Sequence, residues 1–162
     1  MGILNTTPDS FSDGAELASS NSGKFRVDIN KALLRARTRV YDGAVIVDVG
    51  GESTRPGADR VPVQEELDRV VPVIERLSSD LDVTVSVDTS SSLVMREAIN
   101  AGARMVNDVR ALADSGALDS IKNFNVALCL MHMQGAPTTM QQAPDYSDVV
   151  SEVSDFLSER VS

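Results

Sequence analysis

Short apolar runs that each end on a polar residue alternate with longer segments of helical period, and this alternation constrains the fold most. Five such runs lie at 2–5, 44–50, 83–88, 104–108 and 126–132. The stretches 44–47 and 126–131 are continuously apolar, as expected of parallel strands that are covered on both faces. We therefore predict five strands that alternate with helices and pair in a parallel sheet with right-handed crossovers.

The segments between these runs repeat their apolar residues at helical spacing. An apolar residue recurs every three or four positions within 25–40 and again within 63–77, so each segment predicts a helix with one face against a core. Shorter helices are predicted at 93–100, 116–122 and about 147–161. Pro72 falls inside the second helix and predicts a kink or a break. Gly43 and Gly102 stand where left-handed C-terminal caps belong.

Two architectures fit this order of elements, an open doubly wound sheet and part of a (β/α)8 barrel. The five predicted strands close in polar residues, which are Asn5, Asp48, Asp88, Asn107 with Asp108, and His132. In a barrel such residues converge on one mouth, whereas a doubly wound sheet gathers them at one switch point. We favour the α/β class with a (β/α)8 TIM-barrel fold. A complete barrel takes about 250 residues, so the 162 residues here cover about the first five βα units.

The charge balance and the few cysteines and histidines exclude several functions. The chain has 15 Lys and Arg against 24 Asp and Glu, a net charge of −9, which argues against nucleic-acid or anionic-membrane partners. The first residues carry no basic leader, and no apolar run reaches the ~20 residues of a membrane span, so we expect a cytoplasmic protein. One cysteine and one histidine leave no disulfide or His/Cys metal site. Any metal would be a hard cation on oxygen ligands.

Two loops after the predicted strands carry the side chains of a binding site. The first loop, 5–14, is dense in short oxygen-bearing side chains. It could ligate Mg²⁺ through an amide oxygen or close over a substrate, or it could be a capping turn. The second loop, 50–57, combines glycines, two hydroxyls and Arg55, the groups that a phosphate-type anion needs. Its alternative interpretation is a turn with a surface arginine.

Asp88 and Asn107 end neighbouring predicted strands, where a carboxylate and an amide offer acceptors and a donor. Together they suit an aminopyrimidinone ring such as a pterin, although each taken singly could cap a loop. We expect His132 to be structural and Cys129, inside an apolar run, to be an inert core residue. Met131 either walls an aromatic substrate or packs in the core.

Five stretches of the chain resemble dihydropteroate synthase, in the family's own order. They are residues 1–5 with 7–14, then 48–57, 86–90, 107–110, and 131–135 with Pro137 and 139–141. The resemblance implies a (β/α)8-barrel transferase of folate biosynthesis. Such an enzyme joins 6-hydroxymethyl-7,8-dihydropterin diphosphate to p-aminobenzoate and releases pyrophosphate with Mg²⁺ as cofactor. It also implies that sulfonamides compete for the site and that the intact family enzyme is a homodimer.

The resemblance further implies roles for individual residues. Asn5 looks like the Mg²⁺ ligand, and Asp88 and Asn107 look like the pterin-recognition pair. This pair and Arg55 are the residues expected to be catalytic. The positions expected to bind substrate are Thr54, Asp88, Asn107, Asp48, Phe11, Asp13, Arg55, Pro56 and Met131.

The family's loops give these positions their chemistry. Thr54 resembles a diphosphate contact, and Asp13, Phe11 and Arg55 resemble mobile-loop residues that close over diphosphate and p-aminobenzoate. The family reaction is dissociative, with diphosphate leaving first. Such a step needs a neutralised leaving group and a pocket that excludes water, so it requires no protein nucleophile.

The chain also departs from the family pattern. Residues 15–23 form a polar inserted loop, and Ala15 stands where the family usually has a second glycine. The family's later aspartate, lysine and terminal arginine–histidine segments have no counterpart in the sequence. We therefore expect residues 1–162 to be the N-terminal part of a single pterin-binding barrel domain, inactive when isolated. Two alternatives stay open: a pterin-barrel methyltetrahydrofolate methyltransferase and a non-catalytic truncated pterin-binding fragment.

Overall fold

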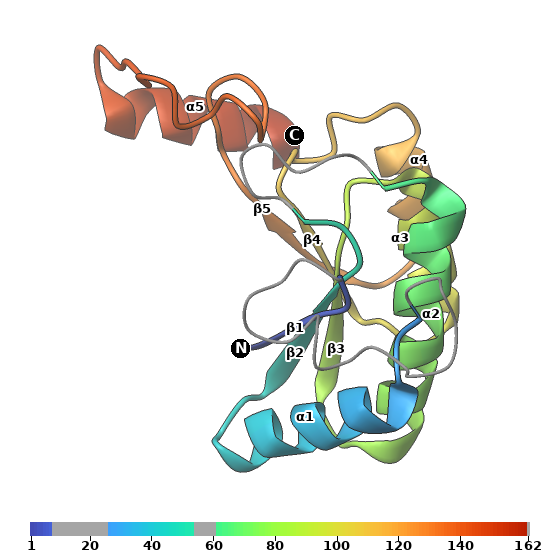
Figure 1. Ribbon diagram of the computed structural model, residues 1–162. Helices are drawn as coiled ribbons and strands as arrows, with labels where there is room; N and C mark the ends of the chain where they lie inside the picture. Colours follow the sequence, from blue (N-terminus) through green and yellow to red (C-terminus); the bar gives the residue numbers. More distant parts are fainter. Residues whose placement is uncertain (8–25, 54–60, 162) are drawn as a thin grey trace.

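The computed structural model describes residues 1–7, 26–53 and 61–161, in which five strands alternate with five helices (Figure 1). The strands are β1 (Gly2–Asn5), β2 (Ile46–Gly50), β3 (Thr84–Asp88), β4 (Met105–Asp108) and β5 (Ala127–Leu130). The helices are α1 (Ile29–Tyr41), α2 (Val63–Asp80), α3 (Ser92–Asn100), α4 (Ala117–Ile121) and α5 (Val149–Val161). The predicted order of strands and helices is confirmed.

The strands form one parallel sheet whose spatial order, β1-β2-β3-β4-β5, is also the order along the chain. Each strand pairs with the next, so the described sheet has no point at which the order reverses. A doubly wound sheet requires such a reversal, whereas consecutive order is that of a barrel. The barrel interpretation of the sequence is therefore confirmed, and the doubly wound alternative is wrong.

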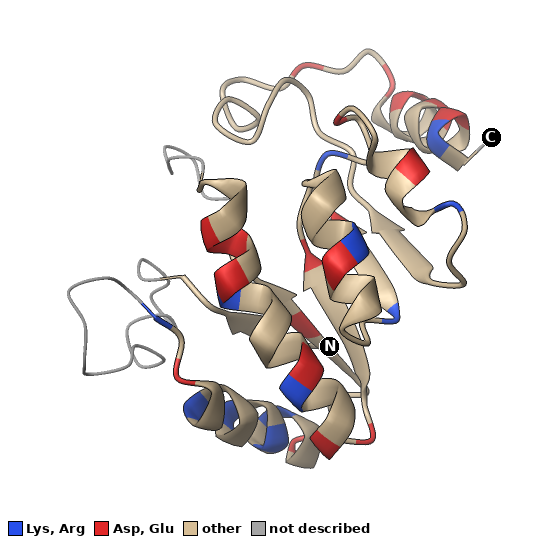
Figure 2. Cartoon of the chain, turned by 90° about the vertical axis from the view of Figure 1, so that its right-hand side faces the viewer, with Lys and Arg blue, Asp and Glu red and all other residues tan. Residues whose placement is uncertain are grey.

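Helices α1 to α4 lie on the same side of this sheet, and the core fills the space between them (Figure 1). Figure 2, turned by 90°, shows the helices in front and the strands behind. The strand residues that face the helices alternate along each strand, as a period of two requires. They are fully buried apolar side chains: Leu4, Val47, Val49, Val85, Val87 and Val106. The other face of the sheet is free to carry polar groups.

Helices α1 and α2 each differ from the prediction for a local reason. Asp28 caps α1, because its Oδ1 accepts the backbone N–H groups of Asn30 and Lys31 at 3.0 and 3.1 Å. The helix therefore begins at Ile29 rather than near residue 25, which lies outside the described residues. The break predicted at Pro72 is wrong, since α2 runs through it as one helix. Its buried apolar stripe continues on both sides of the proline, and this packing holds the helix together.

The two predicted left-handed caps are confirmed. Gly43 has a φ of +98° and Gly102 a φ of +113°, a region that glycine enters without steric cost. Gly102 also lies close to helix α2, because a methyl group there would lie 2.7 Å from the Ser78 side chain. Each glycine turns the chain from a helix into the following strand and so fixes where β2 and β4 begin.

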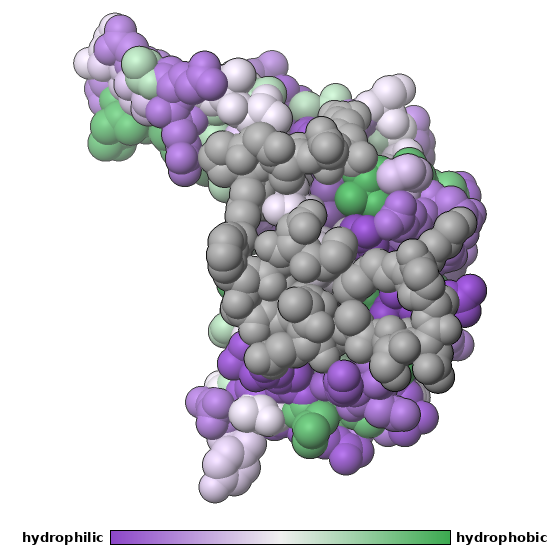
Figure 3. Space-filling view, in the orientation of Figure 1, coloured by the Kyte–Doolittle hydropathy of each residue, from purple (hydrophilic) through white to green (hydrophobic). Residues whose placement is uncertain are grey.

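The last unit, β5 with α5, contributes little to the core. None of the α5 residues is buried, and Leu128 of β5 is exposed, so the cover on both faces predicted for this run is wrong. Figure 3 shows hydrophobic surface beside hydrophilic surface on α5, which stands away from the other helices. Within the described residues, no helix combines the length and the apolar character that crossing a membrane would require.

Candidate functional site

One row of residues crosses the carboxyl ends of four strands on the sheet face away from the helices. Asn5 of β1 is in register with Gly50 of β2, Gly50 with Asp88 of β3, and Asp88 with Asn107 of β4. Partners in a parallel register point to the same side of the sheet. Gly50 leaves space between its neighbours, because a methyl group there would lie 3.5 Å from both Asn5 Oδ1 and Asp88 Oδ2. The structure therefore brings Asn5, Asp88 and Asn107 to one space.

Asp48 lies two residues before Gly50 on β2, on the same face of the sheet, and it holds the Asn107 side chain. Asn107 Nδ2 donates a hydrogen bond to Asp48 Oδ2 at 2.9 Å, although Asp48 is only 5% exposed. Its second oxygen, Oδ1, has no hydrogen-bond partner among the described residues, and neither has the hydroxyl of Ser86, its register neighbour on β3. A buried oxygen without a partner is costly. These oxygens suit a ligand that donates hydrogen bonds.

The surroundings of Asp88 disfavour its ionised form. Burial raises the pKa of Asp88 to about 7. The carboxylates of Asp48, Glu66, Asp108 and Glu52 raise it as well, because neighbouring like charges oppose ionisation. Strongly shifted carboxyl groups in a cleft are typical of functional sites. A ligand that donates N–H groups to Asp88 would favour the ionised form and relieve this repulsion.

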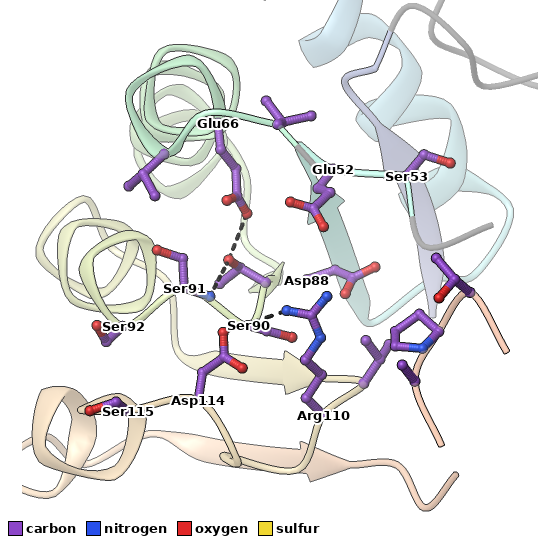
Figure 4. Close-up of a pocket in the computed structure, with 17 residues that line it drawn as sticks. Glu52, Ser53, Glu66, Asp88, Ser90, Ser91, Ser92, Arg110, Asp114 and Ser115 are labelled. Atoms are coloured by element: carbon purple, nitrogen blue, oxygen red, sulfur yellow. Dashed lines mark hydrogen bonds and ion pairs between the residues drawn. The ribbon is translucent and has the colours of Figure 1, made fainter. Parts of the chain in front are cut away.

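A cleft of about 470 Å³ opens beside Asp88. Figure 4 shows the carboxylates of Glu52, Glu66 and Asp88 directed toward it, with the Arg110 guanidinium reaching in from the loop after β4. The start of α3 forms one wall with Ser90, Ser91 and Ser92, and the loop after β5 forms another with Ala136, Pro137 and Thr138. The cleft thus combines acidic, hydroxyl and basic groups at the carboxyl end of the sheet, where barrel enzymes place their sites.

Asp108 ties the two loops that border the cleft. Its buried carboxylate accepts hydrogen bonds from Ser90 Oγ at 2.5 Å, from the Arg110 N–H at 2.9 Å and from the Leu112 N–H at 2.7 Å. The loop that it holds contains two non-glycine residues in the left-handed region, Ala111 with a φ of 51° and Leu112 with a φ of 59°. Such residues need surrounding contacts to persist. Asp108 supplies them and fixes Arg110 at the rim.

Phe11, Asp13, Thr54, Arg55 and Pro56 lie outside the described residues. Their predicted roles stay predictions.

Three predicted positions belong to the last strand or follow it. Met131 comes directly after β5, and its N–H donates to the Asp108 carbonyl at 3.3 Å. His132 packs against the rings of Tyr146 and Phe156, with centroid distances of 5.8 and 4.9 Å, as its expected structural role requires. Cys129 is half-buried on the same sheet face as Asn107. Its prediction as a core residue is wrong, because Cys129 lies on the sheet face away from the helices and outside the buried core.

Sequence reasoning assigned no role to three residues of the site, Glu66, Asp108 and Arg110. A signal for Glu66 was present, because its spacing places it on the same helix face as Val70 and Val73 of α2. A carboxylate on a helix face that should be apolar is costly to bury, so its presence indicates a specific polar contact. Asp108 and Arg110 lie in the stretch 107–110 that resembles the family, but only the tertiary contacts show that Asp108 binds the two loops and positions Arg110.

With this geometry established, comparison with known proteins identifies the family. Residues 1–162 match the family described as "Pterin binding enzyme", and the chain belongs to that family. Dihydropteroate synthase from Escherichia coli strain K12 is 48% identical over 162 residues, which cover 100% of this chain and 54% of that protein. The chain thus spans about half the length of the relatives it matches.

Solved structures show the same similarity in three dimensions. The Yersinia pestis dihydropteroate synthase, in complex with a sulfonamide drug, superposes with a TM-score of 0.89 at 46% identity, covering 99% of this chain and 55% of that one. The Xanthomonas albilineans dihydropteroate synthase with 4-aminobenzoic acid gives a TM-score of 0.82 at 48% identity, covering 99% and 54%. These neighbours are TIM-barrel enzymes, so the five βα units are those of a barrel.

Proposed function

We propose that the complete protein carrying this chain is a dihydropteroate synthase. It joins 6-hydroxymethyl-7,8-dihydropterin diphosphate to p-aminobenzoate and forms 7,8-dihydropteroate and pyrophosphate. The observation that carries the proposal is the row in which Asp88 and Asn107 face one space above the buried Asp48. The names of the relatives support this transferase over a methyltransferase. In this proposal, residues 1–162 are the N-terminal part of a single barrel domain.

The described residues suit the recognition of a pterin ring. Ionised Asp88 can accept two N–H bonds from the aminopyrimidinone edge. Asn107 already donates to Asp48, so its amide oxygen is turned outward as an acceptor. The unpartnered oxygen of Asp48 offers a further acceptor. A ring with several N–H donors would satisfy these groups together, whereas a ring that carries acceptors in their place would leave them unpaired.

The site also fits Mg²⁺ held by few protein ligands. Asn5 Oδ1 lies beside the space above Gly50, and an amide oxygen is a hard ligand of the kind that Mg²⁺ accepts. The described residues contain no group of three His, Cys, Asp or Glu arranged to hold a metal, and Mg²⁺ bound through one side chain takes its other oxygens from water and substrate phosphates. We propose Asn5 as this ligand. When bound, Mg²⁺ neutralises charge on the leaving diphosphate.

The two loops outside the described residues complete the proposal. Thr54 and Arg55 would contact the diphosphate, and Phe11 and Asp13 would close over p-aminobenzoate. Pro56 and Met131 would border the substrates. Because the reaction is dissociative, these residues hold substrates and exclude water, and the chain needs no nucleophile–base pair.

The binding test of this proposal uses the complete protein and calorimetry with the dihydropterin diphosphate. Asp88→Ala should abolish binding, because the N–H edge of the ring would face an apolar wall. The same substitution at the exposed Asp155 is the matched control. Unchanged affinity in Asp88→Ala would refute the pterin assignment.

A turnover assay tests the reaction itself. The complete protein should form dihydropteroate with Mg²⁺, and residues 1–162 alone should not, because an open sheet leaves one side of the site unprotected from water. Turnover by the isolated chain within about tenfold of the complete protein, a barrier difference of about 1.4 kcal/mol, would refute the second expectation. In the same assay sulfonamides should compete with p-aminobenzoate. Sedimentation should show a homodimer, and cell fractionation should place the protein in the cytoplasm.

A further inference from the structure

Helix α2 directs a carboxylate into the interior at its first turns. Glu66 is 3% exposed and shares a helix face with Val70 and Val73, which are buried. A buried carboxylate at such a position costs free energy that an apolar side chain would not. Burial raises the pKa of Glu66 to about 6, against the lowering effect of its hydrogen bond from Thr89.

The contact of Glu66 is with the residue that follows Asp88. Thr89 Oγ1 donates to Glu66 Oε1 at 2.6 Å and accepts the Ser91 N–H at 3.1 Å, as the dashed lines in Figure 4 show. The Thr89 N–H donates in turn to the Asn107 carbonyl at 3.1 Å. Thr89 is therefore held from α2, from α3 and from β4 at the point where β3 ends.

The same turns of α2 also contact the end of β2. Arg69, itself buried, donates from Nη1 to the Gly51 carbonyl at 2.8 Å. A methyl group on Gly51 would lie 2.7 Å from Val70 Cγ1 and 3.0 Å from Glu66 Cγ. Through Glu66 and Arg69, one rigid helix thus sets the ends of β2 and β3 relative to each other, and these ends flank the predicted pterin site.

We propose that Glu66 is a positioning residue, which holds Asp88 through Thr89 in the orientation that receives the N–H edge of a dihydropterin. The role rests on the proposed function. Two parallel hydrogen bonds to one carboxylate require its plane to match that of the ring within about 10–20°. Asp88 is joined to Thr89 by a peptide bond, so a fixed Thr89 limits the rotation of the Asp88 backbone. Glu66 does not contact the ligand in this proposal.

A structural role and a positioning role predict opposite effects of replacing Glu66. Replacing a buried charge by an apolar residue of similar volume is often neutral or stabilising. A purely structural Glu66 would lower stability when removed and leave the affinity of the folded protein unchanged. A positioning Glu66 predicts the reverse, with stability kept and affinity lost.

The test compares Glu66→Met and Glu66→Gln in the complete protein. Methionine keeps the length of the side chain but cannot accept a strong hydrogen bond, whereas glutamine keeps the acceptor oxygen and removes the charge. Glu75→Met, on the exposed face of α2, is the matched control. We measure the unfolding temperature, the Kd for the dihydropterin diphosphate by calorimetry, and the hydrogen exchange of the Ser91 amide without ligand.

We expect Glu66→Met to unfold no earlier than the unsubstituted protein, to exchange the Ser91 amide faster, and to bind about tenfold more weakly. Glu66→Gln should stay within about threefold of the original Kd, and Glu75→Met should change nothing. Unchanged affinity in Glu66→Met, or an equal loss in Glu66→Gln, would overturn the positioning role while the proposed function stands. If the unsubstituted protein fails to bind the dihydropterin, the proposed function falls and takes this role with it.

Discussion

Replacing Asp88 by asparagine should make the protein more stable while removing its affinity for a pterin. The carboxyl group has a pKa of about 7 in the folded protein against an ordinary value of 3.8, since burial and four nearby carboxylates oppose its ionisation. Asparagine has nearly the same shape and carries no charge at any pH. The substitution therefore removes a cost that the folded state bears and the unfolded chain does not.

The sign and the size of the effect follow from linkage. Below pH 3.8 the group is protonated in both states and contributes nothing. Between 3.8 and about 7 only the unfolded chain ionises freely, so the stability of the original protein falls as the pH rises, and above 7 the loss is complete. One pKa unit corresponds to about 1.4 kcal/mol, so the shift sets a ceiling of about 4 kcal/mol. We expect a gain of about 2–4 kcal/mol at pH 8 and about 1 kcal/mol at pH 4.5.

The assay is urea unfolding of the original protein and of Asp88→Asn at pH 4.5 and pH 8, with Asp155→Asn as the control for an exposed aspartate. A gain that grows with pH in Asp88→Asn, and none in the control, is the expected result. Calorimetry on the same samples should show that pterin binding is lost, because an amide N–H would face the ring's N–H groups. An equal gain at both pH values, or a loss of stability at pH 8, would refute the electrostatic reasoning.

Three further substitutions test the local structure. Gly51→Ala should destabilise the protein by about 1–3 kcal/mol in urea unfolding, because the new methyl would overlap Val70; an unchanged midpoint would show that α2 yields freely. Asp28→Ala should cost about 1 kcal/mol by the same measurement through loss of the α1 cap, and no change would mean that the cap is redundant. Asn107→Asp should weaken pterin binding in calorimetry at least tenfold at pH 8, because it sets a second carboxylate 2.9 Å from that of Asp48; full affinity would exclude Asn107 from recognition.

The sequence was sufficient for the architecture and for the central row of the site. Short apolar runs separate cleanly from segments of helical period in this chain, so the order of elements follows from the apolar pattern alone. Asn5 and Asp88 each close a strand and Asn107 is the last residue but one of β4, and parallel strands in consecutive order must bring their ends together. Their convergence could therefore be predicted without any knowledge of contacts.

The remaining features depend on distances that no pattern encodes. The contact between Glu66 and Thr89 joins α2 to the end of β3, 23 residues further along the chain. Asp108 likewise meets Ser90, 18 residues before it. The break that Pro72 could cause does not occur, because packing on both sides of it outweighs the lost backbone hydrogen bond. Cys129 misled the prediction because an apolar run predicts burial on both faces of a strand, whereas Cys129 lies on the face away from the helices and is only half-buried.

The free-energy cost of ionised Asp88 and its use in recognition have the same physical origin. Asp48, Glu66, Asp108 and Glu52 all oppose the ionisation of Asp88. A ligand that brings N–H donors to Asp88 stabilises its charge, so part of this repulsion is released on binding. That release favours ligands with donors over ligands of the same shape with acceptors. The carboxylates around Asp88 therefore make the site selective for a donor-rich ring.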